Sequence, residues 1–248
     1  MESTNSVPLS QEGFAYSDDN LSHIEKYLSS ERLAAYFALA KGDRKFAIQL
    51  YERNTELSEA LYGVIQGFEV TLRNSIHNLM VKETGKDNWY EQIALEQPEL
   101  DALQEAREKI ASRGKAITPG RMVAELTFGF WVRLTASIYE KSIWVKHLHK
   151  IFPIRLDRRR LFERLDSTKQ LRNRIAHQER IIGRRDLLKD YENILEAMRW
   201  MSPVMENWVH STNCFSQRWN KTFKVRKNKT TVAKAAPASA EVPTKSGS

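Results

Sequence analysis

The sequence predicts an all-α helical bundle, and three observations lead to this class. Apolar residues recur at steps of three and four through most of the chain, which is the period of an amphipathic helix. Glycine and proline are few, with 10 and 7 among 248 residues. No stretch shows the sustained alternation of apolar and polar residues that is typical of a strand. With 41% hydrophobic residues the chain can bury a sizeable core, and one compact domain is the simplest expectation.

The most strongly marked helix is expected over residues 58–84. Ser58 can cap its start, and Gly85 can stop it. Between these two residues the apolar face of a central core helix is formed by Leu61, Ile65, Phe68, Leu72, Ile76 and Leu79. Further helices are expected over 20–41, 43–54, 97–113, 119–149 (as one helix or a broken one), 157–165, 168–182 and 186 to about 212.

Both ends of the chain are expected to be disordered, which leaves a helical domain over 20–213. Residues 1–19 form the flexible N-terminal segment, and 214–248 contain a helix end followed by a basic tail. From about residue 220 the tail is rich in Lys, Thr, Ala, Pro and Ser without an apolar period, so burial cannot offset the entropy of ordering it. Its expected role is solubility or a loose, salt-sensitive attraction to RNA.

The net charge of +8 is unevenly distributed. Residues 214–248 hold eight Lys and Arg against one acid, whereas the other 213 residues hold 31 basic and 30 acidic side chains. Within this nearly neutral body, residues 155–190 hold twelve basic residues against six acids. This segment is where a polyanion such as RNA would be attracted.

Cysteine content and hydropathy predict a cytoplasmic protein. The single cysteine, Cys214, excludes an internal disulfide framework and a multi-cysteine zinc site. No apolar run approaches the roughly 20 residues needed to span a bilayer, and the N-terminus lacks the basic and then apolar pattern of a secretory signal. We therefore expect no membrane partner.

The segment "QLRNRIAHQERI", residues 170–181, carries the main functional candidates. A possible capping box at Ser167 and Gln170 and a C-terminal glycine at Gly183 predict its helix over 168–182. Arg172 and His177 are five positions apart, so on a helix they project about 140° from each other. They flank a polar sector opposite the apolar face, and this sector contains Asn173, Ala176 and Arg180. Small Ala176 leaves room for a substrate or a second copy of the chain to approach.

An arginine and a histidine so placed can cleave RNA. Histidine, with an ordinary pKa near 6.5, accepts or donates a proton at neutral pH, and arginine binds phosphate. The RNA 2′-hydroxyl is itself the nucleophile, so this reaction needs no metal. We expect no metal site and no cofactor, because no cluster of His, Cys, Asp or Glu ligands is present. By spacing alone, an ordinary surface helix with an incidental histidine is the favoured interpretation, because an arginine and a histidine five positions apart often occur by chance.

Three segments together resemble a known family. The stretch "LRNRIAHQE" resembles the R-x-x-x-x-H motif of the HEPN superfamily, in which a polar residue follows the arginine. This stretch, "ELTFGFWVRL" and "ERLAAYFALAKGDRKFAIQLYERNTELSEALYGVIQGFEVTLRNSIHNLM" resemble the Abi-like (AbiD/AbiF-type) abortive-infection proteins over about residues 30–212.

The resemblance implies a HEPN-type bundle that acts as a metal-independent endoribonuclease and assembles as a homodimer, so that two motifs share one cleft. It further implies a role in anti-phage defence or as a toxin, with an RNA or protein antitoxin as a further partner. Arg172 and His177 then take the catalytic positions and Asn173 the supporting one. Gln178 and Arg180 depart from the family's frequent "HHEP" continuation, whereas Glu179 is retained. The alternative is a non-catalytic RNA-binding or regulatory protein of the same fold.

A second polar stripe consists of Glu69, Arg73 and His77, at i, i+4 and i+8 of the central helix. One interpretation is an exposed Glu69–Arg73 ion pair, and the other is a buried bracket that orients or completes the catalytic cleft. His77 lies four residues after Arg73, outside the HEPN spacing, and is therefore not taken as the catalytic base. The residues expected to bind RNA phosphates are Arg158, Arg159, Arg160, Arg174 and Arg180.

Aromatic residues in "TFGFWVRL" could stack on bases, but their helical spacing predicts core packing. We therefore place Phe128, Phe130 and Trp131 in the core, and we expect Gly129 to allow close helix packing.

Overall fold

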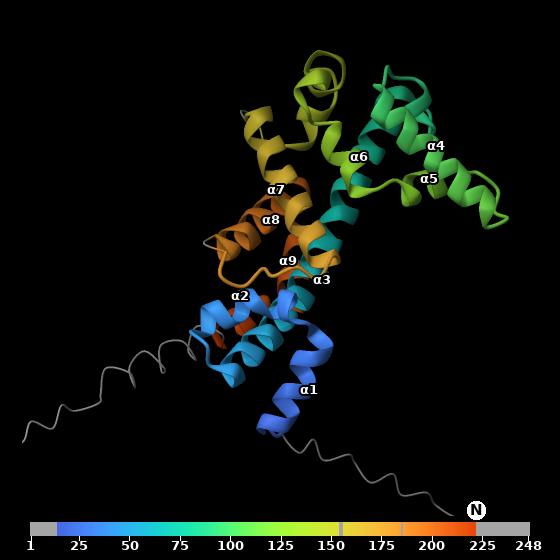
Figure 1. The fold of residues 1–248 in the computed structure, drawn as a ribbon. Coiled ribbons are helices and arrows are strands. Elements are labelled where there is room, and N and C mark those ends of the chain that lie inside the picture. Colours follow the sequence, from blue (N-terminus) through green and yellow to red (C-terminus); the bar gives the residue numbers. More distant parts are fainter. Residues whose placement is uncertain (1–13, 154–155, 185, 222–248) are drawn as a thin grey trace, which may run out of the picture. The chain divides into compact units, whose positions relative to one another are not determined.

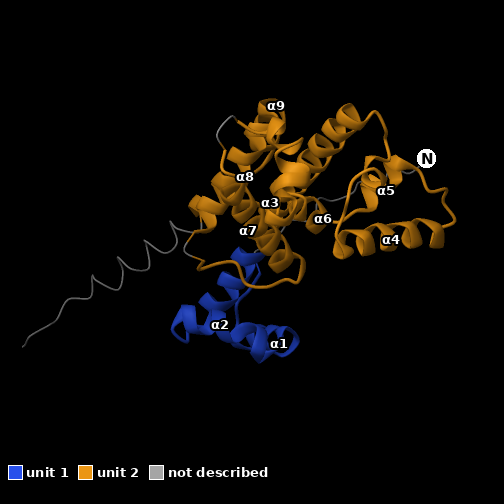
Figure 2. Cartoon of the chain, turned by 90° about the horizontal axis from the view of Figure 1, so that it is seen from above, with its two compact units in different colours: residues 1–55 blue, residues 56–248 orange. Residues whose placement is uncertain are grey.

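The computed structural model describes residues 14–153, 156–184 and 186–221, which fold into helices joined by short connections (Figure 1). No strand occurs among these residues, which confirms the all-α prediction. Contacts divide the chain into two compact units, residues 1–55 and 56–248 (Figure 2). No helix in the described part of the chain is long and apolar enough to cross a bilayer.

The first unit contains α1 (Asp18–Leu28), α2 (Ser30–Ala40) and the start of α3 (Arg44–Thr84). Residue 18 was expected to be flexible, but Ser17 caps α1 by accepting the backbone N–H of Asn20, and two aspartates in the first turn favour a helix start. The expected helix over 20–41 breaks at Ser29, whose φ of 66° ends α1. The Arg44 guanidinium donates to both carboxylate oxygens of Glu25, at 2.8 and 3.0 Å.

The central helix α3 is longer than the sequence indicated. Ser58 lies in its interior instead of capping a new helix, because Leu50, Leu57 and Leu61 bury one apolar stripe through the expected gap. The predicted core face is confirmed from Leu61 to Ile76, with Met80 as its last fully buried position and Leu79 only half-buried. The helix ends at the predicted glycine, Gly85, which has a φ of 71°.

The middle of the chain forms short elements. The 3-10 turn η1 (Trp89–Glu91) leads into α4 (Gln97–Ser112), α5 (Pro119–Glu125) and α6 (Phe128–Arg133). The expected helix over 119–149 is broken first between α5 and α6, and after α6 into η2 (Ser137–Tyr139), the π-helix η3 (Glu140–Trp144) and η4 (Leu148–Ile151). Phe128, Phe130 and Trp131 are buried, as predicted.

Helix α7 (Arg158–Ala176) replaces two expected helices, 157–165 and 168–182. Asp157 caps its start by accepting the backbone N–H of Arg160 at 2.8 Å, so Ser167 lies inside the helix and the expected capping box is wrong. The continuous apolar stripe that joins the two expected halves consists of Leu161, Leu165, Thr168, Leu171 and Ile175. Gly183 has a φ of 87° but lies in the following loop, not at the helix end.

The last part of the chain packs against α3. The expected helix over 186–212 is two helices, α8 (Leu187–Met201) and α9 (Pro203–Thr212), because Pro203 cannot donate to the α8 ladder and holds Ser202 extended. Residues 215–221 are helical, in keeping with the expected helix end. The predicted disordered segments 1–13 and 222–248 lie outside the described residues.

Candidate functional site

Arg172 lies in the last turn and a half of α7 and faces α3. Its Nε atom is 3.9 Å from Oε2 of Glu69, and the two side chains are 39% and 25% exposed. The sequence placed Arg172 near the start of its helix, and the structure places it near the end. The contact joins residues more than one hundred positions apart and brings the second polar stripe to the R-x-x-x-x-H segment.

Glu69 occupies a mixed environment on α3. Burial raises the pKa of its carboxyl above the ordinary value, while the guanidinium groups of Arg172 and Arg73 act in the opposite direction. Arg73 is half-buried and donates through Nε to Oδ1 of Asn74 at 3.3 Å. The carboxylate therefore meets α7 through Arg172, in a contact that is only partly buried.

His77, the third member of the stripe, has a structural partner. Its Nδ1 accepts the indole N–H of Trp89 at 3.0 Å, and Trp89 is fully buried. This bond assigns the ring proton to Nε2 in the neutral form. Burial lowers the pKa of His77, against a smaller opposing effect of Asp87. His77 thus ties α3 to η1, whereas Glu69 contacts α7.

His177 is exposed at the C-terminal end of α7. Its own N–H still bonds to the Asn173 carbonyl at 2.9 Å, so the residue closes the last helical turn. The next residue, Gln178, has a φ of 57°, and its N–H bonds to Ile175. The N–H of Glu179 then bonds to the Arg174 carbonyl at 2.8 Å. This is a Schellman cap with glutamine at the position that glycine usually fills.

Arg174 fastens the loop that follows this cap. Its guanidinium donates to the Arg180 carbonyl at 3.0 Å and pairs with Glu179 at 3.3 Å. Arg180 in turn donates to the Ile182 carbonyl at 3.2 Å. Two of the arginines expected to contact RNA therefore also hold the backbone beside His177. Asn173, the expected supporting residue, is exposed one turn before His177.

The arginines at the start of α7 differ in their surroundings. Arg158 donates to the Thr135 carbonyl at 3.0 Å and pairs with Glu140, and its side chain is 12% exposed. Arg159 pairs with Glu163 on the same helix at 3.0 Å. Arg160 is exposed on the α8 side of the helix. Arg159 and Arg160 thus have more freedom to meet a phosphate than Arg158.

Gly129 and Trp208 differ from what the sequence indicated. Gly129 lies on α6, where an added Cβ would be 3.6 Å from Thr127 and 4.0 Å from Lys169, so the site has ordinary room for a methyl group and close packing does not require glycine. Sequence reasoning missed Trp208 of α9, which is 58% exposed beside a groove. Its exposure depends on the break before Pro203, which the expected continuous helix lacked.

The site offers phosphate binding and proton transfer at one helix end. Arg172 can bind a phosphate oxygen by sharing or leaving Glu69, and exposed His177 can exchange a proton with a substrate. Because the two side chains project about 140° apart around α7, one copy of the chain presents them on the two edges of the polar face of this helix. Among the described residues, no group of three or more His, Cys, Asp or Glu side chains could hold a metal ion.

Comparison with protein families finds one match that covers most of the helical region. The model of the Abi-like protein family matches residues 20–183, which include most of α1 and all of α2 through α7 together with Glu69, Arg172 and His177. No curated protein and no solved structure matches in the corresponding comparisons. Because this match spans well over half of the chain, the chain belongs to the Abi-like protein family.

Proposed function

We propose that this Abi-like protein is a metal-independent endoribonuclease of the HEPN type, active in abortive infection or as a toxin. The observation that carries the proposal is the position of Arg172 and His177 at one end of α7, with Arg172 in contact with Glu69 of α3. The family supports a role in abortive infection. The resemblance of "LRNRIAHQE" to the HEPN motif supports the reaction.

The proposed reaction uses the 2′-hydroxyl of the RNA as nucleophile. His177 accepts its proton or delivers a proton to the leaving 5′-oxygen, and Arg172 stabilises the negative charge on the phosphate. The products are a 2′,3′-cyclic phosphate and a 5′-hydroxyl end. General acid-base catalysis by one group contributes about 10²- to 10⁴-fold, so a His177→Ala variant should lose at least this factor.

We propose that two copies form the complete cleft. Arg172 and His177 diverge on one α7, so a second copy related by a two-fold axis can supply the complementary group. Light scattering should then give a dimer mass for the active protein. A monomer with full cleavage activity would defeat this part of the proposal.

The cleavage test uses purified full-length protein, single-stranded RNA and EDTA. We expect cleavage with cyclic-phosphate ends, and we expect its loss in Arg172→Ala and His177→Ala. His210→Ala, which removes another exposed histidine, is the matched control and should cleave normally. Complete inhibition by EDTA, reversed by magnesium, would overturn the mechanism. RNA binding without cleavage by the unaltered protein would instead support the non-catalytic alternative.

In cells, expression should arrest bacterial growth only when His177 is intact. An antitoxin, RNA or protein, would be recovered as a second factor that restores growth. Growth arrest that persists in His177→Ala would separate toxicity from the proposed site.

A further inference from the structure

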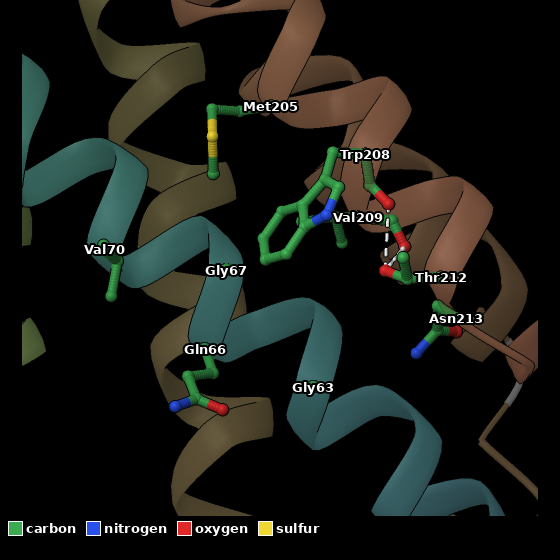
Figure 3. A pocket seen from close by; sticks show the side chains of 9 residues that line it. All are labelled: Gly63, Gln66, Gly67, Val70, Met205, Trp208, Val209, Thr212 and Asn213. Carbon is green, nitrogen blue, oxygen red and sulfur yellow. Dashed lines mark hydrogen bonds between the residues drawn. The ribbon is translucent and has the colours of Figure 1, made fainter.

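A groove lies between α3 and α9, on the second unit. It has a volume of about 330 Å³, near the lower end for small-molecule pockets. Its α3 wall is formed by Gly63, Gln66, Gly67 and Val70, and its α9 side by Met205, Trp208, Val209, Thr212 and Asn213. Figure 3 shows the Trp208 ring projecting from α9 across the groove toward α3. At Gly63 the α3 backbone is exposed, whereas Val209 of α9 covers Gly67.

Trp208 places a large aromatic side chain at the edge of a groove that is open to solvent. Its indole is 58% exposed, and Met205 and Val70 add apolar surface beside it. Single exposed apolar residues are common on protein surfaces, but a large aromatic ring that borders a cavity provides a flat face for stacking. Gln66 is exposed on the opposite wall and offers an amide that can donate to or accept from the edge of a bound ring.

Charge separates this groove from two others on the same unit. The cavity beside α7 and α8 is lined by charges of both signs, with Arg160 and Arg164 beside Glu163 and Asp190. The groove beside α4 and α5 is acidic, with Asp101, Glu105 and Glu125 against Lys109. The acidic groove beside α4 and α5 would repel a phosphate backbone, whereas the α7–α8 cavity has no net lining charge. The α3–α9 groove has no charged lining residue. It therefore accepts an uncharged ring from a polyanion without an electrostatic penalty.

The groove and the candidate catalytic site share helix α3. Glu69, the partner of Arg172, directly precedes Val70 of the groove wall, so the two lie at nearly the same level of the helix. Gln66, Val70 and Arg73 follow at steps of four and three and share one side of α3, on which Gln66 is exposed and the other two are half-buried. A helix with side chains is about 10–12 Å across, so the groove lies on the order of 10 Å from Arg172.

We propose that the α3–α9 groove is a base-binding subsite for single-stranded RNA, in which Trp208 stacks on an unpaired base near the phosphate held by Arg172. This inference rests on the proposed function, because it takes RNA as the substrate. Arg172 and the net positive charge of the segment 155–190 to which it belongs attract the backbone, while the uncharged groove receives the base. Stacking on tryptophan is tolerant of base identity, so the subsite selects unpaired bases and not a sequence.

The test measures binding with probes that the proposed reaction cannot cut. Full-length protein is titrated into a labelled short oligo(dA) and into an abasic oligomer of the same length, both without 2′-hydroxyls, and anisotropy is recorded. Stacking of one base contributes roughly 5- to 150-fold in affinity, so the unaltered protein should bind oligo(dA) more tightly by about that factor. Trp208→Ala should remove the difference, and Trp208→Phe should keep much of it.

Val204→Ala is the matched control, because Val204 is a more exposed apolar residue on the same helix and does not line the groove. It should bind both probes like the unaltered protein. Equal affinity of the unaltered protein for the two probes, or a base preference that survives Trp208→Ala, would overturn the subsite. A dimer that becomes a monomer in Trp208→Ala, with no change in base preference, would assign the groove to protein association instead.

Failure of the subsite and failure of the catalytic proposal give different results. Base-dependent binding through Trp208 without any RNA cleavage would support the proposed subsite and contradict the proposed ribonuclease activity. Cleavage that depends on His177 without base-dependent binding would do the reverse.

Discussion

Substitution of Gly67 by alanine should destabilise the second unit through one defined contact. A Cβ built on Gly67 lies 2.6 Å from a methyl carbon of Val209 on α9, and a second Val209 methyl is at 3.7 Å. Val209 is 4% exposed and, as a β-branched residue, has little rotamer freedom. Relief therefore requires α9 to move away from α3. Gly63, one turn earlier on the same helix, has only the Asn213 amide nitrogen nearby, at 3.7 Å.

The two glycines give opposite predictions. Alanine is better than glycine in a helix interior by about 0.8–1.0 kcal/mol, and Gly63→Ala should gain about that amount. Overpacking costs about 1–3 kcal/mol, so after the same propensity gain Gly67→Ala should be less stable than the unaltered protein by up to about 2 kcal/mol. Urea-induced unfolding of purified variants measures both free energies.

Val209→Ala provides the internal check. If the methyl contact causes the loss, Val209→Ala should cost less in the Gly67→Ala background than alone, with a coupling energy of about 0.5–3 kcal/mol. Equal stabilisation by Gly63→Ala and Gly67→Ala would refute the described approach of α9 to α3.

Three further predictions concern the surroundings of the candidate site. Burial lowers the pKa of His77, so the folded protein binds fewer protons than the unfolded chain below about pH 6.5, and stability that is present above this pH is lost as the pH falls. His77→Gln keeps an acceptor for Trp89, and its unfolding free energy should vary less between about pH 7.5 and 5.5 than that of the unaltered protein. Gln178 has a φ of 57°, so Gln178→Val should lower the unfolding free energy by about 1–2 kcal/mol relative to Gln178→Gly in the same urea assay. Glu69→Gln removes the carboxylate that competes with RNA for Arg172, so KM in the cleavage assay should fall by up to about fivefold, while Glu192→Gln should leave it unchanged.

Each of these three predictions has an outcome that would contradict it. A pH dependence of stability that His77→Gln leaves intact would place the titrating group elsewhere. Equal stability of the glycine and valine variants at position 178 would show that the left-handed backbone carries no cost. An unchanged KM in Glu69→Gln would mean that Arg172 is not held back from the substrate.

The sequence predicted those features of the helices that depend on neighbouring residues alone. The α3 face from Leu61 to Ile76 and its end at Gly85 depend on side-chain period and on one glycine, both of which are present in the sequence. The predicted helix starts at Ser58 and Ser167 are both wrong, and the reason is the same. A serine can cap a helix or lie inside one, and the buried neighbours Leu57 and Thr168 decide for the interior.

The spacing of the candidate residues could be read from the sequence, but their arrangement in space could not. The spacing of Arg172 and His177 is a sequence property, whereas the ion pair with Glu69 requires α7 to pack on α3. The helix end at His177 was missed because the left-handed position that follows is occupied by Gln178, and glycine is the usual signal for that position. The glycine that was used instead, Gly183, ends no helix.

The exposure of Trp208 follows from one backbone break. Residues 187, 194, 201 and 208 are spaced by seven, so an uninterrupted helix over 186–212 would bring Trp208 within about 60° of Leu187 and Ile194. Both of these residues are buried in α8. Ser202 and Pro203 interrupt the helix and restart it with a new direction, and the Arg199–Glu206 ion pair, at 2.9 Å, spans the corner. After the break it is Val209 that packs on Gly67, while Trp208 lies at the groove with more than half of its surface open to solvent. The same proline that defeats the prediction of a single helix thus supplies the aromatic face on which the proposed base-binding subsite depends.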